Sequence, residues 1–157
     1  MIEIGLIADT HGMLRPAVHE ALAGVAMILH AGDVCSDTIL DELALIAPVQ
    51  AVYGNCDAPW DPGLAAERVV AVEGVRIHVS HGHEVGRPNA ARLIERYPDF
   101  DVLVYGHTHV QKVERVGSVL VVNPGAAGPR RFDLQPSVAR LKVEAATVAI
   151  SLVMLPD

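Results

Sequence analysis

Short apolar runs alternate with amphipathic segments in the first third of the chain. The runs have the length and composition of buried strands, and the segments between them have the spacing of helices. Pro16 falls in the first turn of one helix, and Ser36 stands at the N-cap position of the other. The predicted strands are residues 2–8, 26–30 and 48–53, and the predicted helices are residues 14–23 and 37–46. This order favours a mainly parallel sheet with helical crossovers.

The pattern changes after the proline-interrupted loop at residues 58–67. Pairs of apolar segments now follow one another across tight turns such as Gly74, which is typical of β-hairpins. The predicted hairpins join 69–73 to 75–80, 112–116 to 119–123 and 138–143 to 148–153, and a helix at 88–97 and a strand at 101–105 lie between the first two.

Strand–helix units and hairpins do not easily share one flat sheet. We therefore expect an α/β fold, a four-layer α-β-β-α sandwich in which two mixed sheets pack face to face with helices outside. The length of 157 residues fits one domain over positions 1–157.

Composition narrows the class of protein. Hydrophobic residues make up 51% of the chain and charged residues 20%, a globular profile. The formal net charge of −7 argues against strong nucleic-acid binding. No targeting segment or membrane span is evident, and two cysteines are too few for a disulfide framework, so we expect a cytoplasmic protein with reduced thiols. The mean hydropathy of +0.33 leaves room for a homo-oligomeric interface.

Polar side chains recur at the ends of the predicted strands. Each of five such residues follows a strand, and each is 22 to 26 residues from the last: Asp9, Asp33, Asn55, His81 and His107. Ligands collect beyond the carboxyl ends of strands in open sheets, so these side chains could converge on one rim. Two of the loops carry a second candidate two residues on, in the pairs Asp9/His11 and His107/His109.

These side chains have the chemistry of a metal site. Imidazole, carboxylate and amide oxygen ligands suit manganese, iron, zinc and similar ions. Seven side chains exceed the needs of one ion and match two ions that share a carboxylate bridge, for which Asp33 is central in the order.

In this order, the segments Asp9-Thr10-His11, Gly32-Asp33, Gly54-Asn55, His81-Gly82-His83 and Gly106-His107-Thr108-His109 resemble the calcineurin-like metallophosphoesterase superfamily. The resemblance covers about positions 4–125 and is strongest to its compact prokaryotic phosphodiesterase branch, where Asn123-Pro124-Gly125 also has a counterpart.

The resemblance implies an enzyme that binds two divalent cations. Manganese is the expected metal, and iron, zinc, nickel and cobalt are the alternatives. One cation would lie on Asp9, His11, Asp33 and His109, and the other on Asp33, Asn55, His81 and His107. A metal-bridging hydroxide would attack a small phosphodiester or nucleotide-like substrate, with catalytic roles for Asp33, Asn55, His81 and His83. The alternative is a non-catalytic scaffold of the same fold, as in the retromer subunit of this superfamily.

Several residues keep two interpretations. Many members have a leaving-group histidine where this chain has Cys56, so Cys56 is either catalytic or, as we expect for Cys35 too, a small buried filler. His83 is either a substrate contact or a solvated loop residue. The pair Arg130 and Arg131 either binds a phosphate or is solvated. Finally, we expect Asp57 to orient a neighbour or cap a turn, and His30 to pack at a strand end.

Overall fold

The computed structural model describes residues 1–156 and has the element order that the sequence predicts. The elements of the first half are β1 (Ile2–Ile7), α1 (Ala17–Ala21), β2 (Met27–His30), α2 (Asp37–Ala44), β3 (Val49–Ala51), β4 (Glu67–Val72) and β5 (Val75–Ser80). Those of the second half are η1 (His83–Val85), α3 (Ala90–Arg96), β6 (Val102–Val104), β7 (Lys112–Val116), β8 (Val119–Asn123), β9 (Ser137–Glu144) and β10 (Thr147–Met154).

The strands form two mixed five-stranded sheets. The first has the order β10-β9-β1-β2-β3, and the second has the order β4-β5-β6-β8-β7. In the first sheet β1 pairs in parallel with β2 and antiparallel with β9. In the second sheet β6 pairs in parallel with both β5 and β8. The last hairpin therefore extends the N-terminal sheet, and the mixed character predicted for both sheets is confirmed.

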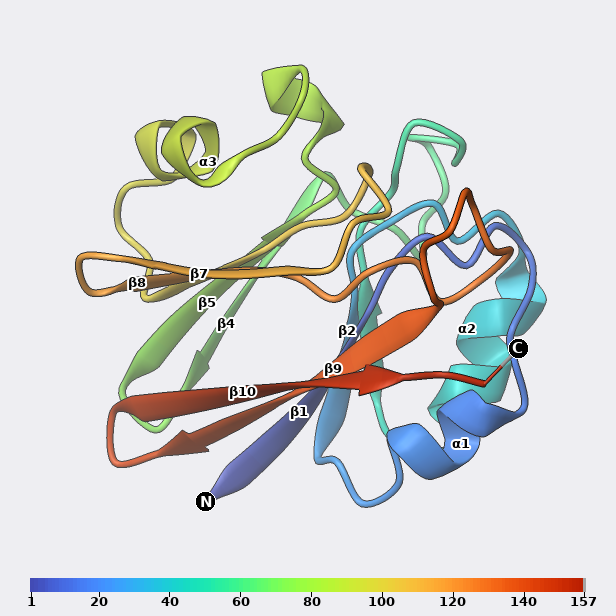
Figure 1. Ribbon diagram of the computed structural model, residues 1–157, viewed down its shortest axis with the longest axis horizontal. Helices are drawn as coiled ribbons and strands as arrows, with labels where there is room; N and C mark the ends of the chain where they lie inside the picture. The colour runs from blue at the N-terminus through green and yellow to red at the C-terminus, as the bar shows by residue number, and fades with distance from the viewer. Residues whose placement is uncertain (157) are drawn as a thin grey trace.

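Three hydrophobic clusters fill the spaces of a four-layer sandwich. The largest lies between the two sheets and includes Leu6 of β1, Leu29 of β2 and Ile77 of β5, all fully buried. A second cluster packs α1 and α2 on the outer face of the first sheet, and a third packs α3 on the outer face of the second (Figure 1). Each fully buried Leu or Ile side chain contributes about 1.5–3 kcal/mol, so this double-sided burial holds the strand ends in fixed positions.

The helices are shorter than predicted. The helix expected at 14–23 spans only Ala17–Ala21, with Pro16 as its N-cap, and ends before Gly24, whose φ of +83° is left-handed. Ser36 is the N-cap of α2, but its hydroxyl bonds Thr38 Oγ1 at 2.7 Å and makes no capping bond. Among residues 1–156, no helix has the length and apolarity to cross a membrane.

Candidate metal centre

The seven metal-ligand candidates lie in loops that follow five strands of both sheets. Asp9 and His11 follow β1, Asp33 follows β2, Asn55 comes after β3, His81 follows β5, and His107 and His109 come after β6. Because these strands point the same way, their loops gather at one end of the molecule (Figure 1). The structure brings all seven side chains together.

Four of them surround one point. Nε2 of His11 lies 3.2 Å from Nε2 of His109 and 3.9 Å from Oδ1 of Asp9. Nε2 of His109 is 3.6 Å from that same Asp9 oxygen. The fourth member is Asp33, whose Oδ2 lies 3.5 Å from Nε2 of His11.

The other side chains surround a second point, again with Asp33. Nε2 of His81 lies 3.3 Å from Asp33 Oδ2 and 3.1 Å from Asn55 Oδ1. Nδ1 of His107 lies 3.1 Å from that amide oxygen and 3.3 Å from the His81 nitrogen. The same carboxylate oxygen of Asp33 therefore faces both groups.

The donor atoms fit divalent cations. Ligands about 2.1 Å from an ion are about 3.0 Å apart along an octahedral edge and about 3.4 Å along a tetrahedral edge, close to the 3.1–3.9 Å separations here. Oδ1 of Asp9 is buried and has no hydrogen-bond partner among the described residues, which a cation would supply. Nδ1–H of His81 donates to the carbonyl of Ala31 at 2.7 Å, which directs Nε2 into the centre. Burial opposes a charge on this ring, but the carboxylates of Asp33 and Asp9 raise its pKa, so a cation that binds Nε2 would displace a proton.

Backbone donors hold the other oxygen of each carboxylate. The N–H of Cys56 donates to Asp33 Oδ1 at 2.9 Å, and the N–H of His107 donates to Asp9 Oδ2 at 3.1 Å. Each carboxylate thus has one oxygen fixed by the protein and one directed into the centre. The two bonds also join loops that are distant in the sequence, since residue 107 holds residue 9.

The ligand loops have unusual backbone conformations. Five of the seven candidates have left-handed φ angles: Asp9 (53°), His11 (48°), Asp33 (56°), His107 (74°) and His109 (65°). Non-glycine residues rarely adopt this conformation, and clusters of such residues are typical of functional sites. Sequence spacing cannot predict these angles, because they follow from the way the loops interlock.

Asp57 joins the loops after β2 and β3. Its carboxylate accepts the N–H groups of Cys35 at 2.8 Å, Gly54 at 2.8 Å and Val34 at 3.1 Å. Gly54 is required here, because a Cβ at this position would meet the Asp33 carboxylate and lie 2.5 Å from its backbone nitrogen. Asp57 therefore has both of the roles weighed for it: it orients the loop at Val34 and Cys35, and it caps the turn at 54–57, where its N–H also donates to the Gly54 carbonyl at 3.2 Å.

A buried network supports the first loop. His30 is fully buried and accepts the Gly32 N–H on Nδ1 at 3.1 Å, so its Nε2–H donates to Thr10 Oγ1 at 3.0 Å. Thr10 in turn donates to the Val34 carbonyl at 3.2 Å. Burial lowers the pKa of His30 to about 3, so the ring is neutral and structural. From the sequence, only the position of His30 at a strand end could be predicted.

Asn123 supports the loop that carries His107 and His109. Its Nδ2 donates to the Gly106 carbonyl at 3.2 Å and to Thr108 Oγ1 at 3.0 Å, and its Oδ1 accepts the Gly125 N–H at 2.9 Å. An asparagine at a strand end before Pro-Gly was the only sequence signal for this function.

Burial and mutual charge shift the titration of the centre. Burial raises the pKa of Asp9 to about 7 and lowers the pKa of His109 to about 4, with Arg131 lowering the latter further. Burial also lowers the pKa of His11 and His107, so these imidazoles are neutral and able to bind a cation. Burial alone would raise the pKa of Asp33, but the neighbouring His81 and the Cys56 N–H hold it well below its usual range.

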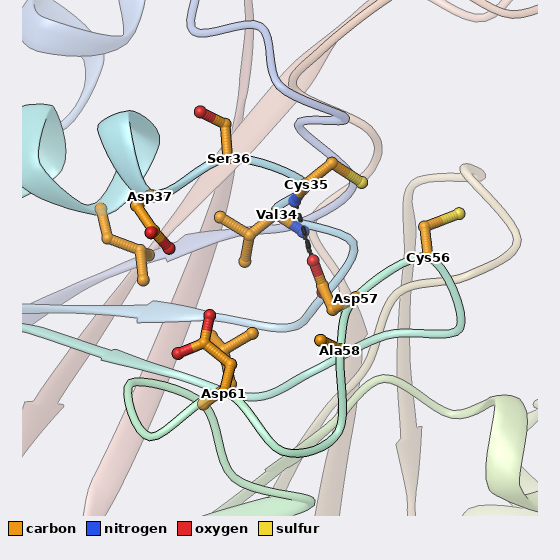
Figure 2. Close-up of a pocket in the computed structure, with 10 residues that line it drawn as sticks. Val34, Cys35, Ser36, Asp37, Cys56, Asp57, Ala58 and Asp61 are labelled. Carbon is orange, nitrogen blue, oxygen red and sulfur yellow. Dashed lines mark hydrogen bonds between the residues drawn. The ribbon is translucent and has the colours of Figure 1, made fainter.

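The prediction that the two cysteines are buried is wrong. Both are exposed, because their loops lie on the rim of a hollow that opens to solvent, and Figure 2 shows both thiols at its edge. This hollow, of about 260 Å³, also carries Asp37, Asp57 and Asp61, and we call it the acidic hollow. Cys35 Sγ lies 3.7 Å from His11 Nδ1, the ring nitrogen that faces away from the centre.

Two further candidates lie beside the centre. The ring of His83 is 5.3 Å from the ring of His81 and 6.2 Å from that of His107, between centroids, and its side chain is 30% exposed. The substrate contact of His83 stays a prediction. Arg131 acts on the pKa of Asp9, His11 and His109, so it lies near enough to influence an anion there.

Comparison with known proteins agrees with this geometry. Residues 2–146 match the calcineurin-like phosphoesterase superfamily domain. A probable metallophosphoesterase of Methanothermobacter thermautotrophicus is 36% identical over 151 residues, which cover 90% of this chain and 86% of that protein. Phosphodiesterase YfcE of Escherichia coli K12 is 31% identical over 151 residues, which cover 80% of this chain and 79% of that protein.

Solved structures are similar over almost the full length. A novel archaeal phosphodiesterase has a TM-score of 0.77 and 25% identity, with 97% of this chain and all (100%) of that one covered. Vps29 of Entamoeba histolytica, complexed with Zn²⁺, has a TM-score of 0.79 and 26% identity, with 98% of this chain and 99% of that one covered.

Proposed function

Because the chain belongs to the calcineurin-like phosphoesterase superfamily, we propose that it is a two-metal phosphodiesterase that hydrolyses small phosphate diesters. One observation carries this proposal. Oδ2 of Asp33 lies 3.5 Å from Nε2 of His11 and 3.3 Å from Nε2 of His81, the geometry of a carboxylate that bridges two ligand groups.

The distances between donor atoms divide the proposed ligands into two groups. Asp9, His11, Asp33 and His109 hold one cation, and Asp33, Asn55, His81 and His107 hold the other. Loops of both sheets contribute to each group, so we infer that the chain acts as one metallophosphoesterase unit. Manganese is the first ion to test, since this mixed donor set does not select one metal and availability decides occupancy.

A pair of divalent cations supplies an ionised water near neutral pH and neutralises the phosphate oxygens. The protein positions the ligands. The Ala31 carbonyl directs His81 Nε2 into the centre, and the backbone N–H groups of Cys56 and His107 keep both carboxylates in position. Arg131 adds positive charge beside the centre, where the approaching substrate carries negative charge.

Two side chains can hold a proton for the leaving oxygen. Burial and the nearby carboxylate of Asp33 raise the pKa of Cys56, so its Sγ is protonated at neutral pH. A thiol of high pKa is a weak acid for this task. His83 is the alternative donor, because its ring lies beside the rings of His81 and His107.

The test combines metal content with turnover. The purified protein should bind about two equivalents of Mn²⁺ and hydrolyse bis(p-nitrophenyl) phosphate when the metal is added. Asp33→Asn and His81→Ala should bind at most one equivalent and lose turnover by at least about a hundredfold, since each removes a ligand that fixes a cation.

Matched controls use an exposed acid and an exposed histidine away from the centre. Asp41→Asn in α2 and His19→Ala in α1 should keep both metal content and turnover. Circular dichroism establishes that each variant is folded. Wild-type turnover that is absent with every divalent metal, or unchanged in Asp33→Asn, would contradict the proposal.

The competing function is a non-catalytic scaffold. Its support is the likeness to Vps29, but that likeness extends to a Vps29 that binds Zn²⁺, so metal binding alone does not separate the two functions. Turnover does, because a scaffold needs no ionised water.

A further inference from the structure

A second hollow lies beside the centre, and its charge is opposite to that of the acidic hollow. It has a volume of about 320 Å³, and its charged lining consists of Arg87, Arg92 and Lys112. The remaining lining comes from neutral residues, Asn89, Tyr105 and Thr108 among them, with no acidic residue. We call it the basic hollow. The chain has a net charge of −7, whereas the lining of this hollow has three cationic residues and no acidic residue, so the sign of the charge is locally reversed.

The basic hollow adjoins the metal centre directly. A neighbouring hollow of about 440 Å³ is lined by Gly86, Arg87, His107 and Thr108. The two hollows share Arg87 and Thr108, and the second contains the proposed ligand His107. A substrate held at the centre can therefore extend from His107 along the 86–89 loop into the basic hollow.

Arg92 is held in place by the loop. Arg92 Nη1 donates to the Arg87 carbonyl at 2.8 Å and lies 3.8 Å from the position that a Cβ on Gly86 would occupy. Asn89 Oδ1 accepts the Arg92 N–H at 2.8 Å and fixes the start of α3. Within residues 1–156 no salt bridge involves Arg87 or Arg92, so these two guanidinium groups have no carboxylate partner that a ligand would have to displace. Lys112 is different, because its Nζ pairs with Glu114 Oε1 at 2.8 Å.

The charge on this lining defines the ligand. A solvated basic surface would need no hollow between two loops, and a neutral ester substituent would need no cations. Arginine binds phosphate through paired N–H groups, and the two arginines alone match the charge of a dianionic phosphate, with the ion-paired Lys112 as a further N–H donor. The acidic hollow is unsuited to such a group, because Asp37, Asp57 and Asp61 would repel it (Figure 2).

We propose that Arg87, Arg92 and Lys112 form an anion subsite for a second phosphate group of the substrate. The preferred substrates are then phosphodiesters that carry an additional phosphate, such as nucleoside bisphosphate esters. This inference rests on the proposed phosphodiesterase function for its kinetic test, but the subsite itself contains no proposed metal ligand and can be tested without metal.

The first experiment measures binding without turnover. Inorganic phosphate is titrated into the ¹⁵N-labelled, EDTA-treated protein, and backbone amide shifts are followed. Saturable shifts are expected at residues 86–92 and 108–112, and they should be lost in the double variant Arg87→Ala/Arg92→Ala. Lys142→Ala removes an exposed cation of β9 and should leave the shifts intact. Absence of shifts in both segments of the wild type would overturn the subsite, whatever the enzyme hydrolyses.

The second experiment compares two substrates with the same leaving group. Thymidine 5′-(p-nitrophenyl phosphate) and its 3′-phosphorylated form differ only in the second phosphate. Wild type should favour the 3′-phosphorylated form by about tenfold in kcat/KM, about 1.4 kcal/mol, mainly through KM. The preference should fall to about one in the double variant, persist in Lys142→Ala, and weaken as ionic strength rises from about 0.05 to about 0.3 M.

Equal kcat/KM for the two substrates in wild type, or a preference that the double variant retains, would refute the proposal. Turnover of bis(p-nitrophenyl) phosphate reports the general activity separately, because this diester has no second phosphate. If this turnover persists while the preference for the 3′-phosphorylated substrate is absent, the phosphodiesterase function is supported and only the subsite is refuted.

Discussion

Substitution of Asp57 tests whether the centre depends on hydrogen bonds behind the proposed ligands. Asp57→Ala removes the acceptor for three N–H groups, those of Val34, Cys35 and Gly54. Bonds to a charged acceptor contribute about 1.5–3 kcal/mol each when buried. Asp57 is partly exposed, so water replaces some of this, and we take about 1 kcal/mol for each bond. The expected loss is about 3 kcal/mol, roughly a 150-fold change in the unfolding constant.

Asp57→Asn is a conservative substitution that should cost less stability than Asp57→Ala. An amide oxygen in the position of Oδ2 keeps the bonds from Val34 and Gly54, but the amide NH₂ then faces the N–H of Cys35. The expected loss is about 1–2 kcal/mol.

Two assays separate the effects of these substitutions. Urea unfolding in EDTA measures the loss in the metal-free protein, and calorimetric titration with Mn²⁺ should show affinity lowered by about 10- to 100-fold in Asp57→Ala. If Asp57→Ala unfolds within about 0.5 kcal/mol of wild type and binds Mn²⁺ equally well, the loops do not depend on this carboxylate and the reasoning is wrong.

Three other predictions follow from the shifted titrations. The pKa of Asp9 is raised from 3.8 to about 7, so in EDTA the folded protein has its full Asp9 contribution below about pH 4 and loses it as the pH rises to about 7. The free energy of unfolding of Asp9→Asn, measured with urea, should therefore rise relative to that of wild type between about pH 4 and about pH 7, by at most about 4 kcal/mol. A difference between the two proteins that does not change with pH would contradict a buried charge on Asp9. Because a proton competes with a cation for the Asp9 carboxylate, whose pKa is raised to about 7, Mn²⁺ occupancy measured by equilibrium dialysis should fall below about pH 6, and flat occupancy down to about pH 5 would count against Asp9 as a ligand. Because Cys56 is a weak acid, turnover should be low for simple alkyl phosphate monoesters and higher for diesters with good leaving groups, and equal turnover across a leaving-group series would refute this role.

The sequence predicted the layers of this fold because each layer has its own periodicity. The hairpin from Lys112 to Asn123 was predicted with its observed bounds, and the two-sheet sandwich was confirmed. The sequence did not say which sheet the last hairpin joins. Its pairing with β1 buries Leu141 and Val143 between the sheets, a long-range contact that no local pattern encodes.

The proposed ligands could be found from the sequence because strand ends are regular in their spacing. The groups that hold those ligands could not be found in this way. Thr10 and His30 act through a buried bond across 20 residues, and the Ala31 carbonyl has no side-chain signature at all. The exposure of Cys35 and Cys56 was also missed, because an apolar residue type says little about a loop whose position is set by Asp57.

The strain in the ligand loops bears on whether the proposed centre holds cations. A left-handed conformation costs about 1–2 kcal/mol for a non-glycine residue, and five proposed ligands adopt it. The sum, roughly 5–10 kcal/mol, is comparable to the entire net stability of a typical domain, about 5–15 kcal/mol. The sandwich core and the bonds of Asp57, Thr10 and Asn123 hold these loops in place, and Asp9 remains buried without a partner. A protein that binds no cation gains nothing from such an arrangement. A cation site does, because binding of the ions returns free energy to the folded state, and the strained loops then hold the donor atoms where the chemistry requires them.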